Sequence, residues 1–429
     1  MIFRGIAVLL LGLMSFDIAF AEESPNTTVV TQQTAVSMAL KNNPGLAEMQ
    51  ARADAATAIP SQIGTLPDPV LSFNALNLPT DTFNLSQEAM TQLQVGLSQA
   101  IPFPGKLALK EEAAQHESEA IGQSVDEMRL SLARDVKRAW WQLLYLDRAL
   151  DIVRLNQDLL RQFVTIAETK YKVGQGLQQD VLLAQVELSK LLDSEIQLTG
   201  MRRSEAARLN ALLGRSANNP VSVPNRVDTH LPSLPADETL YLLAEKSRPL
   251  LAGQRSRIDA ARSRLDLAEK DYYPDFKVNA AYGARSGYNP NQTSRADFAS
   301  FGVAMNLPIY TGSKLDKAVD QRKAELLGQT YNLQDTQLQV QKTITTARAD
   351  FEQAREQVSL FETGIIPQSR QTVASMFAGY QVNKVDFLNL VRAQLTLYNY
   401  ETQYWKALTT ANQAMAKLVA AVGKENFDE

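Results

Sequence analysis

Few residues in this chain are of the types that carry out catalysis or hold a metal ion. The 429 residues include two His, His116 and His230, and no Cys, which excludes disulfides, thiolate metal sites and cysteine nucleophiles. The motifs G-x-S-x-G, H-E-x-x-H, G-x-x-x-x-G-K-[ST] and G-x-G-x-x-G are all missing. The two His lie far apart, and the ten Met are scattered. We therefore expect neither an enzyme nor a protein with a cofactor or a resident metal ion.

The composition is that of a folded protein without a strongly charged surface. Apolar residues make up 45% of the chain and the formal charge is -4, so global disorder is excluded. The near-neutral net charge provides no strongly basic surface for nucleic acid, which is therefore not an expected partner. The length allows two or three domains or one large repetitive unit.

The first residues have the pattern of a secretory signal peptide. A single Arg at position 4 precedes the apolar run 6–16, and Ala19-Phe20-Ala21 is a small-x-small cleavage site. A buried N-terminal helix is the alternative interpretation. No later segment provides an apolar run of about 18 residues. We expect residues 1–21 to be removed and the mature chain to be exported, without a lipid anchor because it has no Cys.

The rest of the chain is an internal repeat. Two series of identical residues recur at constant offsets, which chance matches would not maintain over such distances. Pairs 205 residues apart include Pro44 and Pro249, Asp54 and Asp259, Pro69 and Pro274, and Asn74 and Asn279; pairs 209 apart include Tyr171 and Tyr380, Val173 and Val382, Ala184 and Ala393, and Gly214 and Gly423. We expect a first repeat over 22–219, a Pro-rich linker over 220–236, a second repeat over 237–423 and a tail over 424–429.

Each repeat contains two segments in which apolar and small polar residues alternate, a pattern typical of β-strands. These segments predict one β-hairpin at about 69–101 and another at about 274–308. Taken alone, the alternation also fits a half-solvated soluble sheet. If the strands instead span a membrane, four cannot close a barrel, since the smallest membrane barrels have about 8 strands. Three chains would then share one barrel of 12 strands.

Between the strands and the repeat boundaries lie helices that are long for a globular domain. From Lys106 to Val173 there is no Pro, and a continuous helix there would approach ~100 Å. Its apolar residues recur at steps of three or four, close to the spacing of coiled coils. The second repeat continues the pattern from Val340 to Ile365. Turns at 171–176 and 380–384 send each long helix back as an antiparallel hairpin, although an ordinary helical bundle would show the same periodicity.

A duplicated helix–strand–strand–helix–turn–helix chain behind a signal peptide resembles the TolC family of outer-membrane efflux channels. The resemblance covers almost the whole mature chain. Its most specific segments are Asn42-Asn43-Pro44, the run 96–106 that ends in Pro102-Phe103-Pro104-Gly105-Lys106, the related Leu307-Pro308-Ile309-Tyr310-Thr311-Gly312, and the two Tyr-x-Val turns followed by Ala-Gln. It implies a mainly α fold with a small β part, in which helical hairpins form a trimeric α-barrel and four strands per chain contribute to a shared 12-stranded transmembrane β-barrel.

Residues 78–106 look more like the heavy-metal branch of this family. That resemblance implies a homotrimer in the outer membrane of a Gram-negative bacterium, surrounded by outer-membrane lipid and extended by helices into the periplasm. The implied partners are a periplasmic adaptor (membrane fusion) protein and a proton-driven inner-membrane pump of the RND type.

The resemblance also implies that the helical turns form a periplasmic tip with a constricted aperture. The residues expected to contact the adaptor are Val173, Gly174, Gly176, Leu177, Val382, Asn383 and Val385. Those expected at the aperture are Tyr171, Asp180, Tyr380, Asp386, Asn389 and Arg392.

The aperture departs from the family pattern at two positions. Asn389 and Arg392 stand where carboxylates would be expected, which weakens the idea of an acidic ring that binds cations. A gate closed by pairing of Asp180 with Arg392 is our hypothesis. The alternative for Asp180 and Asp386 is a helix N-cap or a solvated acid in the first turn.

Three functions follow from these patterns. The first is a passive exit duct of a tripartite efflux system that exports heavy-metal cations, with selectivity residing in the pump. The second is the same duct for drugs, other small organic molecules or a polypeptide. The third, from a different class, is a soluble periplasmic coiled-coil adaptor.

Overall fold

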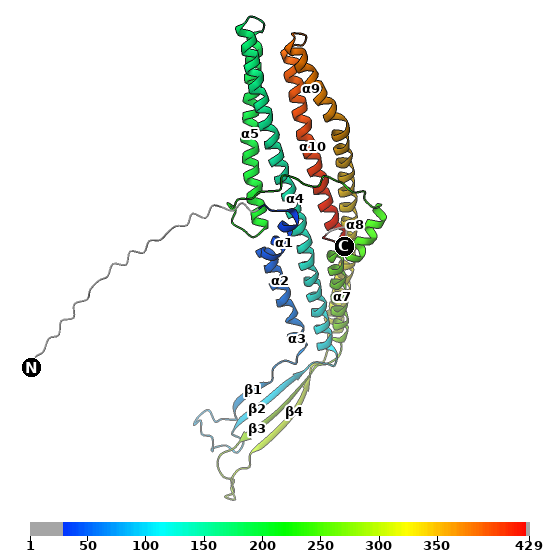
Figure 1. The fold of residues 1–429 in the computed structure, drawn as a ribbon. Coiled ribbons are helices and arrows are strands. Elements are labelled where there is room, and N and C mark those ends of the chain that lie inside the picture. The colour runs from blue at the N-terminus through cyan, green and yellow to red at the C-terminus, as the bar shows by residue number, and fades with distance from the viewer. Residues whose placement is uncertain (1–28, 426–429) are drawn as a thin grey trace, which may run out of the picture.

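The chain is an elongated molecule with a sheet at one end and two helical tips at the other (Figure 1). A computed structural model describes residues 29–425. The expected signal peptide at 1–21 and the last residues of the expected tail lie outside this range. The predicted mainly α chain with four strands is confirmed.

Helices account for most of the described chain, and the two π-helical turns lie in its second half. The α-helices are α1 (Gln32–Asn42), α2 (Pro44–Thr57), α3 (Ile59–Gly64), α4 (Lys106–Lys172), α5 (Gln178–Leu212), α6 (Asp237–Ser247), α7 (Pro249–Lys270), α8 (Asp316–Leu360), α9 (Ile366–Gln381) and α10 (Phe387–Val422); the π-helical turns are η1 (Thr311–Leu315) and η2 (Phe361–Ile365). Within residues 29–425, no helix combines the length and the apolar character that crossing a bilayer requires.

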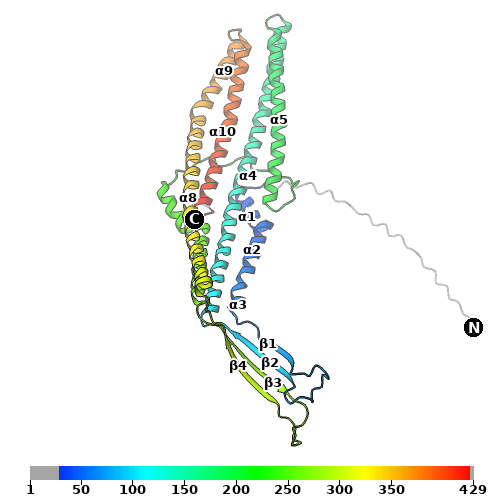
Figure 2. The ribbon, with the colours of Figure 1, turned by 180° about the vertical axis from the view of Figure 1, so that it is seen from behind.

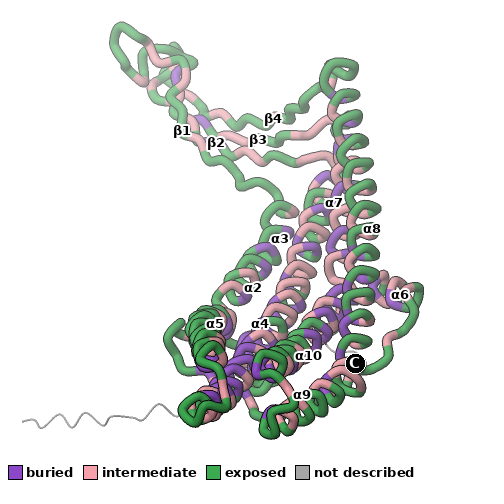
Figure 3. The backbone as a smooth tube through the Cα atoms, turned by 90° about the horizontal axis from the view of Figure 1, so that it is seen from above, coloured by how far each residue is buried: buried purple, intermediate pink, exposed green. Residues whose placement is uncertain are grey.

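Helix α4 is the helix around which much of the molecule packs. It runs without interruption for 67 residues, which corresponds to about 100 Å. α5 and α10 pack beside its tip half, and α2, α3 and α7 beside its other half (Figures 1 and 2). Its apolar seam is buried between these neighbours, as the purple stretches of Figure 3 show. The continuous helix expected from the sequence is therefore present.

The second long helix is not continuous. The π-helical turn η2 separates α8 from α9, which has Pro367 in its first turn, and the apolar seam changes register there. Val340 to Val358 are buried as expected, but Ile365 is only half-buried, and Ile366 takes the buried position after it. The expectation that the seam passes through Ile365 is wrong by one residue, because a π turn accommodates one extra residue without ending the helix.

The strands β1 (Val70–Leu76), β2 (Gln92–Ile101), β3 (Phe276–Ala284) and β4 (Phe298–Met305) form one antiparallel sheet in sequence order. The register places Phe73 opposite Val95, and Val95 opposite Tyr282. It also places Phe301 opposite Ala280. Because side chains alternate between the two faces of a sheet, these apolar residues share one face, and Ser, Asn, Gln and Gly occupy the other. β1 and β4 each have one edge without a strand partner in the described chain.

The segment between the two repeats wraps across the helices as a belt (residues 213–236; Figure 1). Val221 and Val223 on this belt are buried against the helices. Ser222 pairs with Val29, so the belt also holds the first described residues of the chain.

Candidate functional site

The two helical hairpins end side by side in equivalent turns (Figures 1 and 2). In the first turn the backbone N–H of Gln175 donates to the carbonyl of Lys170 (2.8 Å), and in the second Lys384 donates to Gly379 (2.9 Å). Gly174 and Asn383 adopt left-handed conformations, with φ of 73° and 60°. Both hairpins thus close with the same hydrogen bond, which leaves the residues expected to contact an adaptor at the end of the molecule.

The tips carry exposed apolar side chains. Val173 is 64% exposed, Leu177 58% and Val382 62%. Val385 is half-buried because it packs against Gly379 in the second turn. Gly174, Gly176 and Asn383 form the rest of the turns. Apolar residues gathered at an outermost point form a surface suited to another protein.

Below the tips an apolar cluster joins all four helices. Its buried members include Leu160 and Phe163 from α4, Val181 from α5, Tyr380 from α9 and Leu390 from α10. Because one hydrophobic cluster spans both hairpins, the tips pack as a unit in the single chain.

Lys170 connects the two tips directly. Its Nζ donates to the carbonyl of Tyr380 (2.6 Å) and to Oδ1 of Asn383 (2.6 Å). The same amine lies 4.2 Å from the centre of the Tyr380 ring, within the range of a cation–π interaction. Sequence reasoning missed this residue. The available signal was that the position 209 residues later is Gly379, so the two repeats differ here.

The expected aperture residues are only partly brought together. Tyr171 is exposed, whereas its repeat equivalent Tyr380 is buried and its hydroxyl has no hydrogen-bond partner. Burial raises the pKa of Asp180, and the nearby Asp386 raises that pKa further. Asp180, Asp386, Tyr380 and Lys170 therefore share one electrostatic environment at the tip.

The capping interpretation applies differently to the two acids. Leu177 is the N-cap of α5, and Asp180 lies in the first turn, so it is not an N-cap. Asp386 occupies the N-cap position of α10, but its side chain makes no capping hydrogen bond. The Asp180 carboxylate accepts a hydrogen bond from the backbone N–H of Leu177 at the start of its own helix, whereas the Asp386 carboxylate makes no such bond. The helix dipole favours both.

Asn389 and Arg392 lie on the exposed side of α10. Within residues 29–425 the charges that act on the pKa of Asp180 are Asp386, which raises it, and Lys170, which lowers it. No salt bridge joins Asp180 to Arg392 in this part of the chain. In one chain the positive charge that acts on Asp180 is that of Lys170, whose Nζ bonds Tyr380 and Asn383. A pairing of Asp180 with Arg392 would have to form between two chains.

At the other end of α4, the segment 102–106 anchors the helices to the sheet. The ring of Phe103 stacks on Tyr273 at 4.5 Å, and its N–H donates to Asp275 (2.8 Å). Lys106 is buried, and its Nζ contacts Asp271 (3.2 Å) and Asp275 (3.0 Å) and donates to the Tyr273 carbonyl (3.0 Å). These contacts give Phe103 and Lys106 of this run a structural role at the start of the long helix.

The model of the family described as outer membrane efflux protein matches residues 35–215 and 240–424. The chain belongs to this family. The two matched segments each contain one β-hairpin and one helical hairpin of the structure.

Individual relatives agree with this assignment. The cobalt-zinc-cadmium resistance protein CzcC of Cupriavidus metallidurans is 23% identical over 98% of this chain and 98% of its own length. The outer membrane protein VceC of Vibrio cholerae superposes with a TM-score of 0.76 at 19% identity, over 92% of this chain and 96% of that one. The CusC structure superposes with a TM-score of 0.76 at 16% identity, over 92% of each chain.

This outer membrane efflux protein is thus a channel protein of the TolC family, and its location is the outer membrane of a Gram-negative bacterium, as expected from the sequence. Its long helices and small sheet are those of the structures it resembles.

The described residues of this efflux protein contain no group of three or more His, Asp or Glu arranged to hold a metal ion. His116 lies 3.1 Å from Glu119 one helical turn away, and His230 is exposed on the belt. The two His therefore remain apart in the fold.

Proposed function

We propose that this protein is the trimeric exit duct of a tripartite efflux system and passes heavy-metal cations across the outer membrane. The observation that supports it most is the sheet, which has four strands, a continuous apolar face and two outer edges that no strand of residues 29–425 pairs with. Open strand edges are not tolerated in lipid. Pairing β4 of one chain with β1 of the next would close a barrel of 12 strands from three chains.

The helices supply the rest of the duct in this proposal. α4 and the α8–α9 helix extend about 100 Å from the sheet, and in three copies they would line a periplasmic tunnel. The exposed Val173, Leu177 and Val382 would bind a periplasmic adaptor, which in turn docks an inner-membrane RND pump. The exposed apolar face of the sheet argues against a soluble periplasmic adaptor, since Phe301 is 85% exposed and Phe73 74%.

The choice of metal cations rests on the similarity to CzcC along nearly the whole chain. Deleting the gene is expected to lower the tolerated concentration of cobalt, zinc or cadmium salts about tenfold and to leave drug tolerance unchanged. The effect is expected because this protein forms the last step of the export route in the proposal. The measurement is growth inhibition by each metal and by a panel of drugs, with the gene restored on a plasmid as the control. If the deletion increased sensitivity to drugs but not to metals, the duct would instead export drugs or other small organic molecules.

We further propose that Asp180 of one chain pairs with Arg392 of its neighbour in the closed tip. Arg392→Ala is then expected to increase ion leakage through trimers in planar bilayers several-fold, because an ion pair and its electrostatic barrier are lost. Arg370→Ala is the matched control, since Arg370 is an exposed arginine on the same hairpin that pairs with Glu401, away from the turn. Equal conductance of the Arg392→Ala trimers and the unmodified trimers would refute the gate.

A further inference from the structure

A hollow of about 370 Å³ lies between α4, α5 and α10, at the level of the belt. Its polar lining comes from all three helices. Arg138 and Gln142 are on α4, Glu205 and Arg208 on α5, and Gln413 on α10. The side chain of Gln413 links α10 to α4 by donating to the Arg138 carbonyl (3.1 Å).

The hollow opens on the face of α4 that is opposite the belt. Arg138, Gln142 and Leu146 recur every four residues and share one face of the helix. Trp140 and Arg148 point the other way, where Trp140 donates to the Val30 carbonyl (2.8 Å) and Arg148 to the Pro224 carbonyl (3.2 Å). If the belt side faced the axis of a trimer, three belts would fill the duct. In the proposed trimer the hollow would therefore face the inside of the duct.

Positive charge exceeds negative charge in this hollow. Glu205 forms a loose pair with Arg208 at 3.6 Å, and its Oε1 is buried without a hydrogen-bond partner. Arg138 acts on Glu205 only through its field, and it forms no salt bridge in the described part of the chain. Two guanidinium groups thus face one carboxylate, and neither is engaged in a close bidentate pair.

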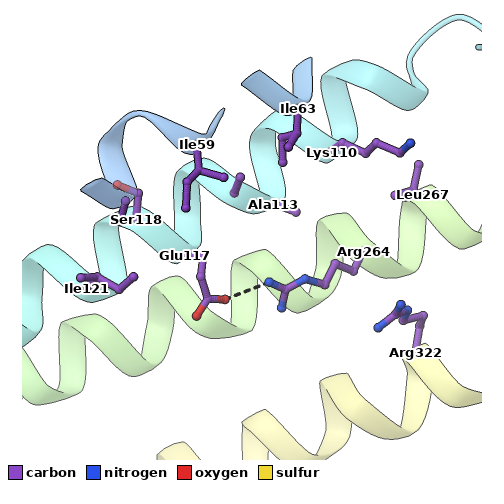
Figure 4. A pocket seen from close by; sticks show the side chains of 12 residues that line it. Ile59, Ile63, Lys110, Ala113, Glu117, Ser118, Ile121, Arg264, Leu267 and Arg322 are labelled. Atoms are coloured by element: carbon purple, nitrogen blue, oxygen red, sulfur yellow. Dashed lines mark hydrogen bonds and ion pairs between the residues drawn. The ribbon is translucent and has the colours of Figure 1, made fainter. Parts of the chain in front are cut away.

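A second hollow on the same face of α4 has a mostly apolar lining that also includes charged residues (Figure 4). Glu117 lines it, three heptads before Arg138, and a seven-residue spacing keeps residues on one face of a supercoiled helix. Glu117 pairs with Arg264 of α7 at 2.9 Å, Arg322 pairs with Glu325 at 2.7 Å, and Lys110 adds one further cation. At this second level three cations therefore stand against two carboxylates, a smaller excess of positive charge.

We propose that Arg138 and Arg208 form an anion-binding site in the wall of the duct, which takes small solutes that carry a phosphate or carboxylate group. Planar guanidinium groups match both anions. Three chains would place three such sites around the duct. The inference rests on the proposed trimeric duct. It means that the wall at this level does not attract metal cations, so other components of the efflux system would select them.

The test compares wild-type trimers with the Arg138→Gln/Arg208→Gln variant in planar bilayers at low ionic strength, where charges are least screened. We expect the ratio of chloride to potassium permeability to fall by about half in the variant, as rings of charge set selectivity. Inorganic phosphate should bind the variant about tenfold more weakly, the effect of losing charge-assisted hydrogen bonds. Phosphate binding is read from its reduction of single-channel conductance.

Two further variants make the outcome decisive. Glu205→Gln removes the opposing charge at nearly constant shape and should change both measurements in the opposite direction. Arg161→Gln removes one charge from α4 on the other side of the helix, more than six turns further along, and should change neither. Wild-type selectivity and phosphate response in both site variants would overturn the anion site alone. Failure of the wild-type protein to form conducting trimers would overturn the duct as well.

Discussion

Lys106→Met is expected to destabilise the folded chain by about 3 kcal/mol, the lower end of the range for removing one partner of a buried ion pair. The lower end applies because Asp271 and Asp275 are 49% and 41% exposed, while the Lys106 side chain is 5% exposed. The substitution leaves both carboxylates without their shared cation and the Tyr273 carbonyl without its donor. These contacts are lost at the junction between α4 and the sheet.

The measurement is the thermal midpoint of the purified protein in detergent, together with the rate of proteolysis between β2 and α4. Lys110→Met is the matched control, because Lys110 lies one turn further along α4 and is exposed. We expect a marked fall in the midpoint and faster cleavage only for Lys106→Met. Identical behaviour of the two variants would show that the buried amine does not hold the junction.

Phe301→Arg should prevent assembly in the outer membrane. Phe301 lies in the middle of β4 on the apolar face and is 85% exposed in the single chain. An Arg facing lipid near the middle of the bilayer costs about 2–4 kcal/mol per chain, and a trimer would carry three. The expected result is loss of the heat-modifiable trimer from detergent extracts of outer membranes, seen as a shift of bands on unheated gels.

The neighbouring position provides the control for this prediction. Ser300→Arg introduces the same charge on the polar face of β4, where water would fill the duct, and should leave the trimer largely intact. Phe301→Leu should also assemble, since it keeps an apolar side chain towards lipid. Normal trimer yield from Phe301→Arg would mean that this face does not contact the bilayer.

The parts of the fold that depend on local periodicity were predictable. Alternation placed Leu71, Phe73, Val95 and Phe301 on one face of the strands, and the observed register keeps them there. Regular apolar spacing likewise predicted the continuous α4 helix. Where the periodicity is broken, the prediction was wrong by one residue, at Ile365. A π turn adds one residue to the helix, and the spacing of apolar residues before the turn does not indicate it.

The candidate sites were predicted less completely, because their contacts join residues far apart in the chain. Tip positions such as Val173 and Val382 followed from the turns and the resemblance. That Lys170 bridges to Tyr380 and Asn383 did not follow, since it depends on how the two hairpins pack. The hollow around Glu205 was not anticipated for the same reason.

By itself the sequence determined the duplicated plan, the positions of strands and long helices, and the family to which the chain belongs, because these depend on spacing along a single stretch of chain. Only the tertiary structure decided the partners of Lys106, the bridge made by Lys170, and the face of α4 on which Arg138 lies relative to the belt. The first two depend on segments of both repeats meeting side by side, and the third depends on where the belt packs against α4. The free energy of that packing depends on complementary surfaces that local patterns do not encode.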